Sequence, residues 1–212
     1  MDAEVADLIV RSRPTILNIL KDRGYVTTNY ENISPAELIE MARNVSLLTI
    51  TAERDPAGSA PMERIHVIYC VDAPIRPSVE KKVEDKFTKE GLDRTKDELM
   101  FVLYEPFHEV FHQRAVQQWT SHKARVSFFH IKNLISDPAK SIWVPPHRKL
   151  TEEEADALIP SLHLRGKFNL PFIIYHVDMQ ARRHGLVPGD IVEIMRPSDT
   201  CGEHTRYRVC VA

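Results

Sequence analysis

The sequence predicts a mixed α/β (α+β) fold in two domains. Residues 1–142 are expected to form an N-terminal α/β domain, a small mixed sheet flanked by helices, and residues 143–212 a compact C-terminal α+β domain. Amphipathic helical segments alternate with short β-branched runs as far as residue 130, the order typical of a sheet covered by helices. The adjacent prolines Pro145-Pro146 favour an extended hinge, and only short elements follow it.

The N-terminal elements carry clear start and stop signals. Apolar residues recur with helical spacing from Val5 to Leu20, and Gly24 stands where a left-handed C-terminal cap is expected. Ser34-Pro35-Ala36-Glu37 is a capping box that opens a second helix. Runs rich in β-branched residues then predict the next elements of this domain, in order: a strand at 45–51, a loop at 55–61, a strand at 65–71, a helix near 77–89, a buried strand at 99–104, a helix near 107–121 and a strand at 126–129.

The C-terminal domain begins after the hinge at residues 143–147. Thr151-Glu152-Glu153-Glu154 is a second capping box. The expected elements after this helix are a strand at 172–177, a short helix from Asp178 to Gly185, a turn at 187–190, a strand at 191–195 that Pro197 ends, and a strand at 206–211. In the last strand, Tyr207 and Arg208 are expected on opposite faces.

Composition excludes several classes of protein. The net charge of −2 gives no general attraction to nucleic acid or to an anionic membrane. The three cysteines lack C-x-x-C spacing, which favours reduced thiols inside the cell. Neither a signal peptide nor an apolar run long enough to span a membrane is recognised. Phosphate-loop and dinucleotide motifs are absent, so no membrane partner, small-molecule substrate or cofactor is expected.

One short motif suggests metal chemistry. His108-Glu109-Val110-Phe111-His112 has the H-E-x-x-H pattern, in which two histidines on one helix face bind zinc and the glutamate polarises a water. A zinc metallopeptidase also needs a third ligand, but the extended motif is broken at Ala115 and Gln118.

No further glutamate occurs before Glu152, beyond the hinge. We therefore expect no metal site here, but a helix that packs Phe107, Phe111 and their apolar neighbours on the sheet, with both histidines near its surface.

Two charged segments have a plain structural alternative. Glu84-Asp85-Lys86 could imitate a nuclease corner, but it lies in a charged stretch typical of a solvated helix face. Lys123 and Arg125 form a modest basic spot, for which a solvated turn and a DNA contact are both open.

A longer pattern near the C-terminus resembles a known family. The matched residues are Gly185-Leu186-x-x-Gly189-Asp190-x-Val192-x-Ile194-x-Arg196-Pro197-Ser198-Asp199-Thr200-x-Gly202, with Tyr207-Arg208 after them. The resemblance continues at Val144-Pro145-x-His147, at Asp178 and in Asp22-Arg23-Gly24-Tyr25. This pattern resembles the fifth subunit shared by eukaryotic nuclear RNA polymerases, whose C-terminal domain also occurs in an archaeal polymerase subunit.

The resemblance implies a non-catalytic role in transcription. In that family the C-terminal domain anchors the subunit on the largest polymerase subunit, next to other small subunits. The N-terminal domain forms a lower jaw near downstream DNA, with at most weak DNA contact. A nuclear location is expected, in the nucleolus if the chain is specific to polymerase I. The histidines of the zinc pattern would lie in the jaw, where the family has no catalytic role.

The matched residues give the candidate sites. We expect a subunit interface, because arginine is favoured at interfaces, and we place Lys123 and Arg125 nearest to DNA. The residues assigned to this interface are Asp178, Arg182, Arg196, Pro197, Ser198, Tyr207 and Arg208.

Departures from the family pattern suggest a divergent member, specialised for one polymerase class. Phe172 replaces a common arginine, Met179 a proline, and Glu193 a common lysine. Val187-Pro188 replaces a basic turn, and Glu105 stands where the jaw helix usually has threonine. A free-standing protein-interaction adaptor with the same fold remains the alternative, because a docking surface does not name its partner.

Overall fold

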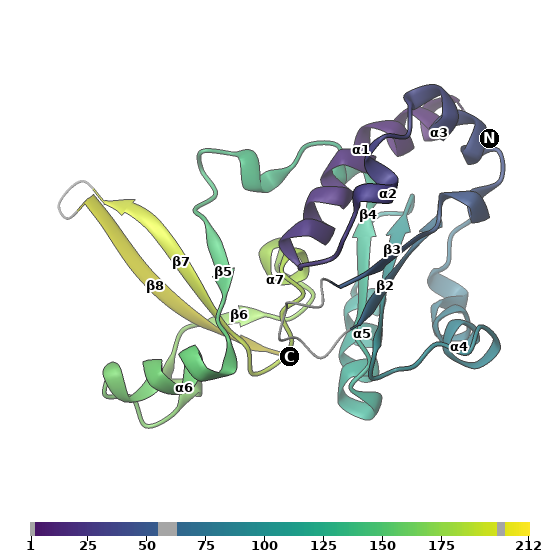
Figure 1. The fold of residues 1–212 in the computed structure, drawn as a ribbon. Helices are drawn as coiled ribbons and strands as arrows, with labels where there is room; N and C mark the ends of the chain where they lie inside the picture. Colours follow the sequence, from purple (N-terminus) through teal and green to yellow (C-terminus); the bar gives the residue numbers. More distant parts are fainter. Residues whose placement is uncertain (1–2, 55–62, 199–201) are drawn as a thin grey trace. The chain divides into compact units, whose positions relative to one another are not determined.

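The computed structural model of the chain describes residues 3–54, 63–198 and 202–212. Its contacts fall into two compact units, residues 1–136 (unit 1) and residues 137–212 (unit 2). Each unit contains a four-stranded sheet with helices, which confirms the predicted mixed α/β fold (Figure 1). The loop expected at 55–61 and the motif residues Asp199 and Thr200 lie outside the described residues.

Unit 1 is a mixed sheet with helical connections. Its strands have the order β1-β2-β3-β4, with β1 antiparallel to β2 and the other pairs parallel. The elements are α1 (Ala3–Asp22), α2 (Thr28–Glu31), α3 (Pro35–Ala42), β1 (Ile50–Glu53), β2 (Arg64–Cys70), α4 (Val79–Lys89), β3 (Asp97–Leu103), α5 (Glu109–His122) and β4 (Val126–His130). Helices α4 and α5 are the crossovers that parallel pairing requires. None of the helices that the structure describes is long and apolar enough to cross a membrane.

Local signals explain where the first helices begin and end. Helix α1 ends at Asp22, and Gly24 just after it has a φ of +83° that suits glycine, while the amide of Tyr25 donates to the carbonyl of Leu20 at 2.9 Å. The capping box of α3 forms as predicted, because Ser34 accepts from the Glu37 amide and Glu37 accepts from the Ser34 amide.

The strand predicted at 45–51 is wrong in its first half. Residues Val45–Leu48 form a 3-10 turn, and strand β1 begins only at Ile50. The Asn44 side chain accepts bonds from the amide of Ser46 at 3.3 Å and from its hydroxyl at 2.6 Å. Such a side-chain bond offers the backbone a turn in place of an extended strand, and it outweighs the β propensity of Val45.

A buried charge pair fixes the end of α1 to the sheet. Glu98 lies in β3, every residue of which is buried, and its carboxylate pairs with Arg23. The Tyr25 hydroxyl donates to the second carboxylate oxygen of Glu98 at 3.0 Å. The Asp22-Arg23-Gly24-Tyr25 segment therefore supplies a helix stop and two partners for one buried carboxylate.

Unit 2 is built around a long antiparallel pair of strands. Its elements are β5 (His147–Lys149), α6 (Glu152–Ser161), β6 (Phe172–Ile174), α7 (Met179–Arg183), β7 (Ile191–Ser198) and β8 (Gly202–Val211), with strand order β5-β7-β8-β6. The core holds Leu150, Leu170, Ile191 and Val209, against which residues of α6 pack. Helix α6 begins at the predicted Thr151 capping box.

The prediction that Pro197 ends its strand is wrong. Strand β7 continues to Ser198, with Pro197 opposite Glu203 and Ser198 opposite Gly202. The neighbouring strand β5 reaches only as far as the bond from the Met195 amide to the Pro146 carbonyl. Pro197 therefore stands where β7 has a partner on one side only, a position that tolerates the missing proline amide.

A second buried ion pair ties the start of unit 2 to α7. Asp137 pairs with Arg183 at 2.6 Å, with 6% and 3% of the two side chains exposed, and it also caps the turn at Pro138–Lys140 through the Ala139 amide. Contacts therefore divide the chain after Ser136, six residues before the boundary expected from the Pro145-Pro146 hinge. The roles assigned to the two domains stay predictions.

We expect Asp137→Asn to destabilise unit 2 by about 3 kcal/mol, because it removes the negative charge that pairs with the buried Arg183, while an asparagine can still cap the turn. Urea denaturation followed at the amides of β7 and β8 measures this loss. Asp156→Asn on the exposed side of α6 is the matched control, with a change within about 0.5 kcal/mol. Equal stability of the two variants would contradict the anchoring role of Asp137.

Candidate subunit interface

The pairing of β7 with β8 decides which of the expected interface residues can act together. Alternate residues of a strand point to opposite faces of the sheet. Because Arg196 lies opposite His204 and Val192 opposite Arg208, these four side chains share one face, which we call face B. Pro197 and Tyr207 point to the other face, face A, which carries the core residues Ile191 and Val209. The structure therefore separates Pro197 and Tyr207 from the arginines.

Residue His147 lies near the charged side chains of face B. It pairs with Ile194 and so points to the same face. Its ring stacks on that of His184, with 6.1 Å between centroids, and its Nδ1 lies 2.7 Å from the Pro145 carbonyl. A carbonyl only accepts hydrogen bonds, so this nitrogen must carry the proton.

The environment of His147 favours its neutral form. Burial is the largest cause that lowers its pKa below the ordinary value, and the charges of Arg196 and Arg208 lower it further. The Pro145 carbonyl and the Asp178 carboxylate act in the opposite direction. Three of the expected interface residues, Asp178, Arg196 and Arg208, thus lie close enough to His147 to influence its charge.

Asp178 and Arg182 are largely occupied inside the chain. Asp178 caps α7 by accepting from the amides of Gln180 at 2.7 Å and Ala181 at 3.4 Å. Arg182 is 9% exposed, and burial lowers the pKa of its guanidinium to about 10 despite the nearby Asp178. Both residues shape the local structure, and Arg182 offers little surface to a partner.

The expected interface residues on β7 and β8 differ in how much of each side chain is available to a partner. Arg208 donates to the Phe172 carbonyl at 2.8 Å, which occupies part of its guanidinium. The Tyr207 hydroxyl bonds Glu193 at 3.3 Å. Arg196 and Pro197 are exposed, and Ser198 is half-buried at the end of β7. The sequence-based interface set left out His147, His184 and Arg206, although strict alternation along the last strand already groups Arg206 with Arg208.

The H-E-x-x-H segment has a different geometry from a zinc site. His108 is not in the helix but precedes it, with φ −130° and ψ 150°, and its Nδ1 accepts from the Val110 amide at 3.2 Å. His108 is therefore the N-cap of α5, and the two histidines do not share a helix face. Across the described parts of the chain, no group of three or more His, Cys, Asp or Glu side chains could hold a metal ion.

The expected packing of α5 is only partly correct. Phe111 is fully buried and contacts Phe128 of β4 at a centroid distance of 5.1 Å. Phe107, predicted to pack on the sheet with it, is 38% exposed because the helix begins only after His108.

The basic spot of unit 1 is organised around an aromatic ring. Lys123, at the left-handed end of α5, places its ammonium 5.1 Å from the centre of the Trp119 ring. The guanidinium of Arg125 lies 5.9 Å from the same ring, and Arg125 is only 9% exposed. Of the two residues expected near DNA, Lys123 alone offers an exposed charge.

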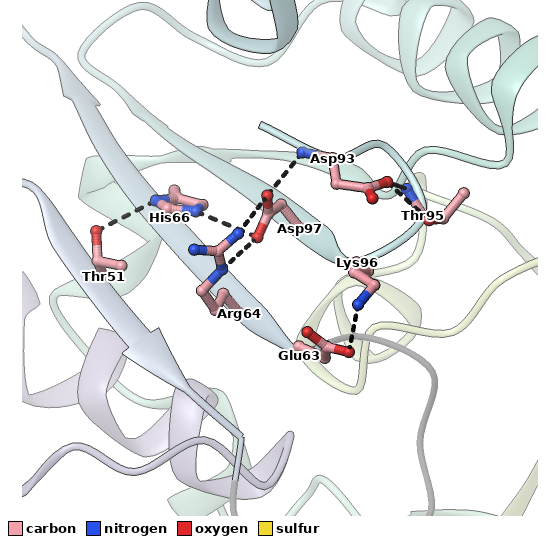
Figure 2. A network of polar contacts seen from close by, with 8 residues as sticks. All are labelled: Thr51, Glu63, Arg64, His66, Asp93, Thr95, Lys96 and Asp97. Carbon is pink, nitrogen blue, oxygen red and sulfur yellow. Dashed lines mark hydrogen bonds and ion pairs between the residues drawn. The ribbon is translucent and has the colours of Figure 1, made fainter. Parts of the chain in front are cut away.

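Unit 1 also contains a polar network around the buried Asp97 that superficially resembles a catalytic triad (Figure 2). The Thr51 hydroxyl lies 3.2 Å from Nδ1 of His66, and Nε2 of His66 lies 3.6 Å from Asp97. However, Asp97 accepts two bonds from Arg64, at 2.8 and 3.1 Å, and one from the Asp93 amide at 2.7 Å. The arginine neutralises the carboxylate, so the network serves to join β1, β2 and the start of β3.

Taken together, the fold and the exposed arginines Arg196 and Arg206 of face B are typical of a protein that works through contacts with other macromolecules. A model of the family described as "RNA polymerase Rpb5, C-terminal domain" matches residues 137–210, almost the whole of unit 2. The family match therefore falls on the unit that carries face B.

Named proteins match both the whole chain and a part of it. A Dictyostelium discoideum protein named "DNA-directed RNA polymerases I, II, and III subunit rpabc1" is 28% identical over 203 residues, covering 96% of this chain and 97% of that protein. The "DNA-directed RNA polymerases I, II, and III subunit RPABC1" of Caenorhabditis elegans is 25% identical over 212 residues, covering 95% and 94%. The "DNA-directed RNA polymerase subunit Rpo5" of Archaeoglobus fulgidus is 46% identical over 68 residues, covering 32% of this chain and 87% of that protein. The chain belongs to the family of the fifth subunit of DNA-directed RNA polymerases.

The charges around His147 give a test of the face B geometry. We expect its imidazole to titrate below about 6.5, the ordinary pKa of histidine, in an NMR pH titration of the full chain. Arg196→Gln should raise this pKa and Asp178→Asn should lower it, because each removes one neighbouring charge. Arg165→Gln, an exposed arginine outside face B, is the control and should leave it unchanged.

The same shift makes the stability of unit 2 depend on pH. With a folded pKa below the unfolded one, the unfolded chain binds more protons, so stability falls as the pH drops below about 6.5 and goes on falling to the folded pKa. Titration of His147 above 6.5, or no response to Arg196→Gln, would contradict the arrangement.

Proposed function

We propose that the chain is a non-catalytic structural subunit of a nuclear DNA-directed RNA polymerase. Unit 2 anchors it on the largest subunit, beside neighbouring small subunits, and unit 1 contributes to the lower jaw around downstream DNA. The observation that carries this proposal is the pattern of coverage. Eukaryotic polymerase subunits match nearly the whole chain, whereas archaeal polymerase subunits match a stretch about as long as unit 2 that makes up 80–87% of their own length.

That pattern supports unit 2 as the part that anchors the chain. An archaeal subunit that is matched over most of its length by a stretch the size of unit 2 needs no jaw to be a polymerase subunit. By the same logic, unit 2 of this chain holds the determinants for assembly. Unit 1 is then an additional domain, and its role depends on the position at which unit 2 binds the polymerase.

Charge supports a peripheral role at DNA. Residues 1–136 hold eighteen lysines and arginines against twenty aspartates and glutamates. Such a balance gives no general attraction to a phosphate backbone, so DNA contact has to be local and weak. Lys123, exposed beside Trp119, is the residue we place nearest to DNA.

Two departures from the family pattern differ in what they change at the surface of unit 2. Phe172, in the position of a common arginine, is 53% exposed and offers an apolar surface. Glu193, where lysine is common, pairs with Arg148 at 2.9 Å, so its negative charge is compensated inside unit 2. We propose that the chain is specialised for one polymerase class, and the exposed Phe172 supports this more than Glu193 does. A nucleolar location follows if that class is polymerase I.

The test is co-purification with tagged fragments at a salt concentration that removes loose charge contacts. We expect tagged residues 137–212 to recover a near-stoichiometric polymerase core by mass spectrometry, as the full chain does, and tagged residues 1–136 to recover none. The largest subunit recovered identifies the polymerase class. Recovery of the full chain alone, or with unrelated partners, would overturn the proposal and leave a free-standing adaptor.

A further inference from the structure

Face B continues beyond the sheet as a basic strip on the β7–β8 ribbon. We use "basic strip" for Arg196, His204 and Arg206, with Arg208 at its base. The register places Arg196 opposite His204 and Arg206 opposite Ile194, so all point to one face. Strand β5 pairs with β7 only as far as His147 opposite Ile194, and β6 pairs with β8 only from Val209 onward. Figure 1 shows the two strands running on together past both neighbours.

The charges of Arg196 and Arg206 in this strip are not used within the described chain. Arg196 and Arg206 are exposed, and neither makes an ion pair or hydrogen bond with another residue that the structure describes. The ribbon's own acids point away from them, because Glu193 lies opposite Tyr207 and Glu203 opposite Pro197, both on face A. Glu193 is also already paired with Arg148. Among the described residues of β7 and β8, the face that carries these two exposed arginines has no carboxylate of its own.

We propose that the basic strip binds an extended acidic segment of a partner polypeptide in the polymerase. Residues 204, 206 and 208 lie two apart along β8, which spaces their side chains by about 6.6 Å. An extended peptide also spaces its alternate side chains by this distance. Carboxylates at every second position of such a peptide therefore lie opposite successive side chains of the strip. This inference rests on the proposed polymerase role and adds the chemistry of the contact.

A protein partner fits the strip better than nucleic acid does. Unit 2 holds ten lysines and arginines against ten aspartates and glutamates, so no wide positive field accompanies the strip. Its reverse face is part apolar, with Met195 41% exposed beside the exposed Pro197. A short run of arginines next to apolar surface is the composition of protein interfaces, whereas phosphate backbones select larger basic surfaces.

The test measures binding of a fluorescent twelve-residue peptide of alternating glutamate and alanine to the full chain by anisotropy. We expect binding that weakens as salt rises, and that falls by about tenfold or more in Arg196→Glu/Arg206→Glu, because two attractive contacts become repulsive. Lys140→Glu/Arg165→Glu changes the net charge equally at exposed positions outside the strip and should bind like the wild type. Arg208 is left intact because it bonds the Phe172 carbonyl.

The neutral double variant Arg196→Gln/Arg206→Gln controls for a folding defect in the glutamate variant. It should show a loss of peptide affinity that lies between those of the wild type and the glutamate variant. Absence of peptide binding by the wild type, equal loss in strip and control variants, or tighter binding of a twelve-base-pair DNA duplex than of the peptide would each overturn the inference. Co-purification of the wild type with the polymerase core is measured in parallel. Failed co-purification with intact peptide binding removes the polymerase as the source of the partner and leaves the strip as a site for acidic peptides, whereas co-purification without peptide binding removes the strip alone.

Discussion

The register between β7 and β8 is the constraint on which unit 2 depends. Eight residue pairs, from Ile191 with Val209 to Ser198 with Gly202, run without interruption along the two strands. This pairing sends Ile191 and Val209 to the core and the arginines to the opposite face. A slip of one residue would reverse both assignments at once, because side chains alternate with a period of two. Burial of the core therefore also fixes where the charges of face B lie.

Each unit uses a buried ion pair to join segments that lie far apart in the sequence. In unit 1, the buried carboxylate of Glu98 takes Arg23 and Tyr25 as partners and joins a helix end to the central strand. In unit 2, the buried pair of Asp137 and Arg183 joins the first residues of the unit to α7. Buried charges are strongly destabilising when unpaired, so each pair ties distant segments together. The pairing of Asp137 also explains why the segment before the Pro145-Pro146 hinge belongs to unit 2.

Much of this architecture could be predicted from local signals, and the errors have physical causes. The capping boxes at Ser34 and Thr151 and the short helix that Asp178 opens were all predicted, because caps act within four residues. The strand end at Pro197 was wrong because a proline is tolerated where a strand has one free edge, which only the sheet order reveals. For the candidate site, Arg196 and Arg208 do share a face, but Tyr207 points to the other and Arg182 is buried. His147 was missed because its neighbours come from β5, α7, β7 and β8, and tertiary structure alone brings them together.

We propose that unit 2 anchors this chain in a polymerase through its charged face. Hydrogen–deuterium exchange of the free chain, compared with the chain inside the purified complex, tests it most directly, since amides covered by a partner exchange more slowly. The account predicts that added protection concentrates in β7 and β8 and at the His147 end of β5, and is small in unit 1. Protection confined to unit 1, or no difference between the free and assembled chain, would contradict it.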